Sequence, residues 1–128
     1  MKKKTRGRLV KDLDLRFSRY IRQKYSDKEW FCQCYTCWDK HHWKDMQNGH
    51  FVSRANYKYR WDEHNCRPQC YKCNIIFSGN YKTYTLKMIT EYGRERIEAM
   101  IQDKELIKIR TFEIDEKIAY YKNLVTIC

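Results

Sequence analysis

The N-terminal segment of the chain alternates apolar and charged residues with the period of an α-helix. Apolar side chains recur three or four positions apart, and arginine and lysine fill most of the positions between them. The apolar positions of this pattern are Val10, Leu13, Phe17, Tyr20 and Ile21. We therefore expect an amphipathic helix over residues 9–25, preceded by a flexible basic lead over residues 1–8.

A second helical pattern follows the Ser-Gly-Asn tripeptide at residues 78–80, whose members favour turns and helix N-caps. It ends before Gly93, a residue that commonly terminates helices. Its apolar positions are Tyr81, Tyr84, Met88, Ile89 and Tyr92. Two further helices, near residues 94–102 and 114–126, are expected to serve as scaffold with solvated charged faces.

Between these helices the chain contains two Cys-x-x-Cys pairs and has neither a helical period nor the alternation of a larger sheet. Short extended pieces near residues 48–52 and 58–62 favour a hairpin organised by a metal ion. With one proline and four glycines, the sequence has no linker that would divide it. The expected organisation is one α+β domain over residues 9–128, with a core at 30–92 and C-terminal helices at 94–128.

The formal net charge is +11, from 27 lysines and arginines against 16 acidic residues. Residues 1–24 hold ten basic and two acidic side chains, so most of the excess lies in this segment. Such a basic arm suits a polyanion such as nucleic acid, and it also suits a solubilising or localising role. Charge by itself leaves these interpretations open.

The sequence contains neither an apolar run long enough to span a bilayer nor the apolar stretch of a signal peptide. We therefore expect a cytoplasmic protein without a membrane partner. In a reducing compartment, cysteines spaced Cys-x-x-Cys favour metal ligands over disulfides.

Cys34 and Cys37 form one such pair, and Cys70 and Cys73 form the other. Four thiolates complete the tetrahedral shell of a zinc ion, and a closed shell leaves no position for a reacting water. We therefore expect one structural zinc ion per chain. Cys32 is an alternative to Cys34, although its longer spacing from Cys37 makes a poorer pair. The other thiols are expected to be buried or incidental: Cys66 and Cys128.

Three residues in and after the segment between the pairs have the chemistry of a hydrolytic site. His50 lies in the motif NGHF, Asn65 in the motif WDEHNC, and Asn74 directly follows the second pair. A neutral imidazole can deprotonate water near physiological pH, and an amide oxygen can hold Mg²⁺ or Mn²⁺ against a phosphodiester. Their order is similar to that of an HNH nuclease site.

The stretch from CYTC through NGHFVSRANYKYRWDEHNCRPQCYKCNIIFSGNYKTY to Gly93 resembles the NinG/Rap recombination nucleases of lambdoid phages. The shared elements are CxxC, GH, an Arg-aromatic-Asp-Glu-x-Asn step, QCxxCN and SGN, over about residues 10–100. The layout is also similar to phage endonuclease VII, a Holliday-junction resolvase. The resemblance implies a small zinc-stapled ββα-metal (HNH, His-Me finger) core with flanking helices. It also implies a metal-dependent DNA endonuclease that acts on branched recombination intermediates such as Holliday junctions and D-loops.

By this resemblance His50 matches the general base, Asn65 the residue that holds the connecting loop, and Asn74 the ligand of a catalytic Mg²⁺ or Mn²⁺. The four paired cysteines match the zinc ligands. Many HNH nucleases have an acidic metal ligand just before the histidine, where this chain has Gly49. The second ligand therefore stays open, and the candidates are Asp62, Glu63 and Asn80. Three further signature positions have no role assigned by the resemblance: Gln69, Ser78 and Gly79.

Arg54, Lys58 and Arg60 are the expected contacts to the DNA backbone. The other histidines are weaker candidates for a base: His41, His42 and His64. The alternatives to a branched-DNA nuclease are a zinc-stabilised DNA-binding module that has lost cleavage and a homing or restriction-type HNH nuclease. A two-fold dimer through residues 9–25 or the C-terminal helices is a further hypothesis, since a resolvase cuts two strands symmetrically.

Overall fold

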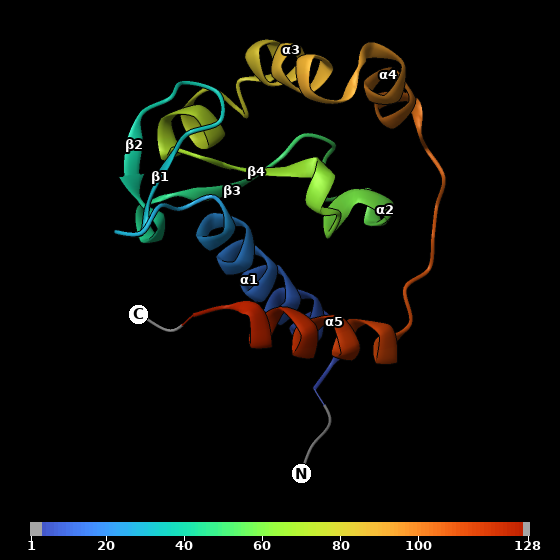
Figure 1. Cartoon of the computed structure of the whole chain (residues 1–128). Helices are drawn as coiled ribbons and strands as arrows, with labels where there is room; N and C mark the ends of the chain where they lie inside the picture. The colour runs from blue at the N-terminus through green and yellow to red at the C-terminus, as the bar shows by residue number, and fades with distance from the viewer. Residues whose placement is uncertain (1–3, 127–128) are drawn as a thin grey trace.

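Five α-helices and two antiparallel two-stranded sheets make up residues 4–126, the part of the chain that the computed structural model describes (Figure 1). In chain order the elements are α1 (Arg6–Lys24), β1 (Phe31–Gln33), β2 (Lys40–His42), β3 (Gln47–His50), α2 (Tyr57–Arg60), β4 (Cys66–Gln69), α3 (Tyr81–Tyr92), α4 (Arg94–Gln102) and α5 (Thr111–Leu124). Three short helical segments of other types complete the order: η1 (Trp43–Asp45), η2 (Glu63–Asn65) and the π-helix η3 (Lys72–Ile76). The expected mixed α+β class is confirmed.

Helix α1 begins earlier than its apolar pattern indicates. Thr5 caps it, because the hydroxyl oxygen of Thr5 accepts a hydrogen bond of 3.3 Å from the backbone N–H of Arg8. Residues 6–8 are helical, so the prediction that the flexible lead extends to residue 8 is wrong. Residues 1–3 of that lead lie outside the described part of the chain.

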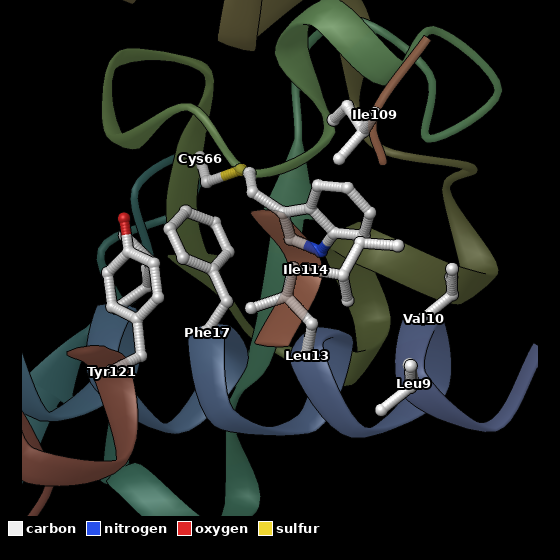
Figure 2. Close-up of a cluster of buried hydrophobic side chains, with 10 residues drawn as sticks. Leu9, Val10, Leu13, Phe17, Cys66, Ile109, Ile114 and Tyr121 are labelled. Carbon is white, nitrogen blue, oxygen red and sulfur yellow. The ribbon is translucent and has the colours of Figure 1, made fainter. Parts of the chain in front are cut away.

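The apolar face of α1 packs against α5, although the two helices are far apart in the sequence (Figure 1). Leu13, Phe17 and Ile21 are fully buried in this contact. They share one cluster with Ile114 and Tyr121 from α5, whose side chains Figure 2 shows beside those of α1. The main core of the protein is therefore built on the apolar side of α1.

Strand β3 lies next to β4 above α1 (Figure 1). The antiparallel register places Gln47 opposite Gln69 and His50 opposite Cys66. The predicted extended piece at 48–52 is thus a strand that begins one residue earlier and ends at His50. Strands β1 and β2 form the second, separate sheet.

The connection between β3 and β4 differs from the prediction. Residues 58–62 were expected to be extended, whereas residues 57–60 form the short helix α2. Its first turn is capped by Asn56, whose side-chain oxygen accepts a hydrogen bond of 3.0 Å from the backbone N–H of Lys58. This cap outweighs the β-propensity of the aromatic residues in the segment.

Helices α3 and α4 confirm the predicted helices at 81–92 and 94–102. Helix α5 begins at Thr111, three residues before the predicted start, because the carboxylate of Glu113 accepts a hydrogen bond of 3.2 Å from the backbone N–H of Arg110. Within residues 4–126, no helix combines the length and the apolar character that crossing a bilayer requires.

The contact between α1 and α5 predicts a large cost for removing one buried side chain. We expect Leu13→Ala to lower the free energy of unfolding by about 2–5 kcal/mol, because Leu13 is fully buried and the change leaves a cavity in the core. Leu15 on the same helix is 45% exposed and is the matched control, so Leu15→Ala should change the free energy of unfolding by about 0.5 kcal/mol or less. Urea denaturation measures both, and equal losses would contradict this packing.

Candidate functional site

The two Cys-x-x-Cys pairs converge on one point of the structure. The Sγ atoms of Cys34, Cys37, Cys70 and Cys73 all lie within 4.8 Å of one another, and those of Cys37 and Cys70 are 3.6 Å apart. Four sulfurs at the usual zinc distance of about 2.3 Å would stand about 3.8 Å apart at tetrahedral corners. The cluster could therefore bind a metal ion such as zinc with little movement of its donors.

Hydrogen bonds within the cluster favour ionised sulfur. The hydroxyl of Thr36 lies 3.4 Å from Sγ of Cys34, and the backbone N–H of Cys73 donates to Sγ of Cys70 at 3.4 Å. Burial raises the pKa of Cys34, but hydrogen bonds from Thr36 and from backbone amides outweigh it and lower that pKa to about 6. Burial raises the pKa of Cys37 and of Cys70. A divalent cation would supply the charge that ionises these remaining thiols.

The other cysteines lie elsewhere. The structure places Cys34 in the cluster, whereas Cys32 lies on β1 outside the set of four donors. Cys66 is fully buried in the core beside α1. Cys128 lies outside the described residues. The two-pair arrangement expected from the spacing is thus the one that the fold assembles.

A hollow of about 430 Å³ opens between α1, the end of β3 and the π-helix η3. Its lining brings together three residues to which the sequence analysis gave a role, His50, Asn74 and Arg54, and two signature positions without one, Ser78 and Gly79. Helix α1 contributes Asp14, and β3 contributes Asn48. The hollow therefore collects a histidine, amide groups and charges of both signs from four separate segments.

The ring of His50 is held in one tautomer. Its Nε2 lies 2.9 Å from the backbone carbonyl oxygen of Arg60. A carbonyl only accepts hydrogen bonds, so Nε2 carries the proton and Nδ1 keeps the free lone pair. Burial lowers the pKa of His50, and nearby Arg54 lowers it further, against the opposing effects of the Arg60 carbonyl and of Asp14. The imidazole is therefore neutral near pH 7 and able to accept a proton at Nδ1.

Asn65 closes the connection between the strands. Its side-chain oxygen accepts a hydrogen bond of 2.7 Å from the backbone N–H of Val52. Its amide nitrogen donates to the carbonyl of Val52 at 3.0 Å and to that of Tyr59 at 3.1 Å. Because the residue is fully buried, these three bonds fix the loop that follows His50.

Asn74 is positioned by the second cysteine pair. It lies in the π-helix η3 directly after Cys73, and its backbone N–H donates to the carbonyl of Cys70 at 2.9 Å. Within residues 4–126, its side-chain amide makes no hydrogen bond, so its oxygen is free for a ligand in the hollow. The cysteine cluster and the hollow thus share this one segment.

The three basic residues expected to contact DNA have different environments. Arg60 forms an ion pair with Asp14 through two hydrogen bonds of 3.0 and 2.6 Å, and Asp14 also accepts from Trp61. Lys58 pairs with acidic side chains of the segment after α4. Arg54 is 62% exposed at the rim of the hollow and lies 3.9 Å from Asp14. Arg54 is therefore the most exposed of the three, and it is the one that lines the hollow.

Asp14 has no counterpart in the sequence-based candidates. In the sequence it is one of several charged residues between the apolar positions of the first helix, and nothing local indicates its contact with Arg60, which lies 46 positions away. Through that ion pair it fixes the segment whose carbonyl holds the ring of His50. Neither periodicity nor motif spacing reports a contact of this range.

The three residues expected as candidates for the second ligand of the catalytic metal ion do not line the hollow. The carboxylate of Asp62 accepts from the backbone N–H of His64 at 2.9 Å, and that of Glu63 accepts from the side chains of Tyr20 and Lys24. The side chain of Asn80 donates to Sγ of Cys73 at 3.7 Å. These three therefore have other partners and do not line the hollow. Asn48 does line it, and its side-chain oxygen is buried without a hydrogen-bond partner within residues 4–126.

The remaining histidines also lie away from the hollow. His42 caps η1 by accepting from the backbone N–H of Lys44 at 3.2 Å, and its ring meets that of Phe31. His64 is exposed and packs edge-on against Tyr92. His41, on β2, pairs with Cys32 in the separate sheet.

A steric constraint explains why position 49 carries glycine. A Cβ atom on Gly49 would lie 2.1 Å from the side-chain oxygen of Gln69. Gln69 is fully buried, and its amide nitrogen donates to Thr36 at 3.1 Å and to the carbonyl of Gly79 at 2.9 Å. The space that an acidic side chain would need is therefore filled by a residue that cannot move aside.

This constraint predicts that Gly49→Ala lowers the free energy of unfolding by about 1–3 kcal/mol through overpacking. Adding Gln69→Ala removes the clashing atoms, so the double variant should lose less than the sum of the two single losses. Gly7 on α1 is the matched control, because a Cβ there meets no atom within 4 Å. Additive losses in chemical denaturation would contradict the clash.

A comparison with models of protein families identifies the family of this chain. Residues 1–127 match the family model described as "Bacteriophage Lambda NinG protein". No curated protein and no solved structure matches the chain. The match spans nearly the whole chain, including the two cysteine pairs, the segment with His50 and the helices on both sides. The protein therefore belongs to the NinG family.

Proposed function

We propose that this protein is a metal-dependent DNA endonuclease of the HNH (ββα-metal) type, which hydrolyses phosphodiester bonds in branched recombination intermediates. The observation that carries the proposal is the hollow that His50 and Asn74 line together. Within residues 4–126, Nδ1 of His50 and the side-chain oxygen of Asn74 have no hydrogen-bond partner. Metal-dependent hydrolysis of a phosphodiester uses a base that deprotonates water and oxygen atoms that hold a divalent metal ion, and these two side chains can supply both.

In this proposal His50 takes a proton from a water molecule at Nδ1, and the resulting hydroxide attacks the phosphorus atom. The phosphorus–oxygen bond to one sugar then breaks, and the leaving oxygen is protonated from solvent. Because Nε2 donates to the carbonyl of Arg60, the imidazolium that forms is stabilised in place. Asn65 keeps the following loop fixed while this charge changes.

A divalent cation such as Mg²⁺ or Mn²⁺, when bound, would polarise the phosphate and stabilise the leaving oxygen. The residues of the hollow fit such an ion, since amide oxygens are ligands that it accepts. Asn74 is the first candidate ligand. Asn48 is the second, because it lies on the same face of β3 as His50 and its buried oxygen lacks a partner within residues 4–126.

The basic side chains support DNA as the substrate unequally. Arg54 stands exposed at the rim of the hollow and is the proposed contact to the phosphate backbone. Arg60 is engaged by Asp14, so its proposed role is to position His50 rather than to bind DNA. A homodimer stays a separate hypothesis. It would not use the apolar face of α1, because that face is buried against α5.

The cysteine cluster is proposed to hold one structural zinc ion per chain, which stabilises the π-helix that carries Asn74. We expect elemental analysis to find about one zinc per folded chain. Cys70→Ser should lose the ion together with helical and sheet structure in circular dichroism. Cys32→Ser, the matched control outside the cluster, should keep the ion. A folded chain with almost no zinc would contradict the assignment.

The nuclease proposal predicts metal-dependent cutting of labelled DNA. We expect the protein with Mg²⁺ or Mn²⁺ to cut four-way junctions and flaps faster than linear duplex. His50→Ala should reduce the rate about 10²–10⁴-fold, because the general base is lost. His64→Ala is the matched control, since His64 is exposed and distant from the hollow.

Equal cutting by His50→Ala and the parent would refute the assignment of the base. Binding of DNA by the parent without cutting under any metal would instead identify a zinc-stabilised DNA-binding module. Asn74→Ala should retain DNA binding and lose cutting, because the change removes an oxygen from the hollow and leaves Arg54 in place.

A further inference from the structure

Three consecutive apolar side chains stand in solvent immediately after Asn74. Ile75 is 48% exposed, Ile76 is 63% exposed and Phe77 is 54% exposed. Within residues 4–126, none of them belongs to any of the three buried clusters of the protein. An exposed apolar run of this kind usually marks an interaction surface.

The run is held firmly by the backbone beneath it. The N–H of Phe77 donates to the carbonyl of Lys72 at 2.8 Å, which closes the π-helix. The N–H of Gly79 donates to the carbonyl of Cys73 at 2.9 Å, which joins the run to the cysteine cluster. Residues 78–80 all have positive φ angles, so a tight turn follows at once. The side chains are therefore presented on a fixed frame, and ordering them on a partner costs little entropy.

The charge around the run favours a polyanion. The chain has no acidic residue from His64 to Thr90, and it has four basic ones in that interval. Two of these, Lys72 and Lys82, are exposed and lie on either side of the apolar run in the sequence. Lys72 reaches Asp39 at 3.5 Å, in a pair whose side chains are both at least half exposed. An apolar strip bordered by lysines matches the base stack and phosphates of DNA.

The position of Ile75 favours DNA over a protein as the partner of the apolar run. Ile75 lines the same hollow as His50 and Asn74. A protein seated on the run would cover that hollow and exclude a phosphate from it. A DNA strand whose phosphate enters the hollow would instead place the adjacent bases beside the run.

We propose that Ile75, Ile76 and Phe77 form an apolar wedge that enters between two bases next to the phosphate held in the hollow. The wedge rests on the proposed nuclease function and assigns it a substrate feature, namely a base step that is already unstacked or easily unstacked. Separating stacked bases costs free energy, and this cost is smallest at a branch point or mismatch. An unstacked step therefore accepts the wedge at the least cost, whereas at a fully paired step the wedge must open the stack itself, in both cases without reading a sequence.

The first test measures unstacking without cleavage. His50→Ala protein is mixed with DNA that carries 2-aminopurine, a fluorescent base quenched by stacking, at the step beside a branch. We expect binding to raise the fluorescence, and Ile76→Ser or Phe77→Ser in the same background to reduce that rise several-fold. Leu86→Ser is the matched control, because Leu86 is 65% exposed on α3 and does not line the hollow.

The second test measures cleavage with His50 intact. Ile76→Ser should slow the cutting of fully paired duplex about tenfold, because the protein must open the stack itself. The same change should have a smaller effect on DNA with an unpaired step beside the cut. Leu86→Ser should leave both rates unchanged. Equal slowing on the two substrates would overturn the wedge.

The outcomes separate the wedge from the function on which it rests. If the parent cuts DNA but Ile76→Ser and Phe77→Ser unstack it as well as their background does, the wedge is wrong and the nuclease stands. If the parent cuts no DNA, the nuclease proposal fails, while the fluorescence of the binding assay still decides the wedge. Sedimentation that shows a dimer lost in Ile76→Ser would identify the run as a self-association surface and overturn the wedge.

Discussion

Four cysteine sulfurs held within 4.8 Å of one another are the constraint on which the rest of the site depends. Thiols crowded this closely in a largely buried position need a cation to become ionised together. Their meeting ties the turn after β1 to the segment after β4. Asn74 and the exposed run beyond it follow Cys73 directly, so the geometry of one wall of the hollow is inherited from the cluster. With zinc bound as proposed, the same four residues would contribute both to stability and to the geometry of the site.

Local patterns in the sequence are sufficient for much of this arrangement. The periodicity of α1, α3 and α4 locates them within a few residues, since each buries one apolar face. The spacing of the cysteines predicts their cluster, because two short turns are enough to converge on one ion. The order of His50 and Asn74 around the pairs similarly anticipates that both line one hollow.

Features that depend on long-range contacts are absent from those patterns. Asp14 reaches Arg60 only because α1 packs beneath β3 and β4, and no local signal reports that packing. For the same reason Arg60 looks like an exposed phosphate contact in the sequence but is neutralised in the fold. The strand expected at 58–62 is a helical turn, because a single cap by Asn56 outweighs the composition of the segment. Asn48 could not be singled out from the sequence, because what makes it a candidate ligand is a buried side-chain oxygen that has no hydrogen-bond partner within residues 4–126.

The packing of α1 on α5 also sets an order of assembly. Helix α1 supplies Asp14 to the hollow, yet its buried face is completed by Ile114 and Tyr121, which lie nearly the whole domain later in the chain. During synthesis the N-terminal helix therefore emerges long before its packing partner and waits for it. The cysteine pairs and the β3–β4 hairpin precede α5 in the chain, and α1 also packs on that hairpin, so part of its packing surface is available before α5 completes it. A nascent chain would thus carry every residue that lines the hollow before it carries the helix that completes the core beneath α1.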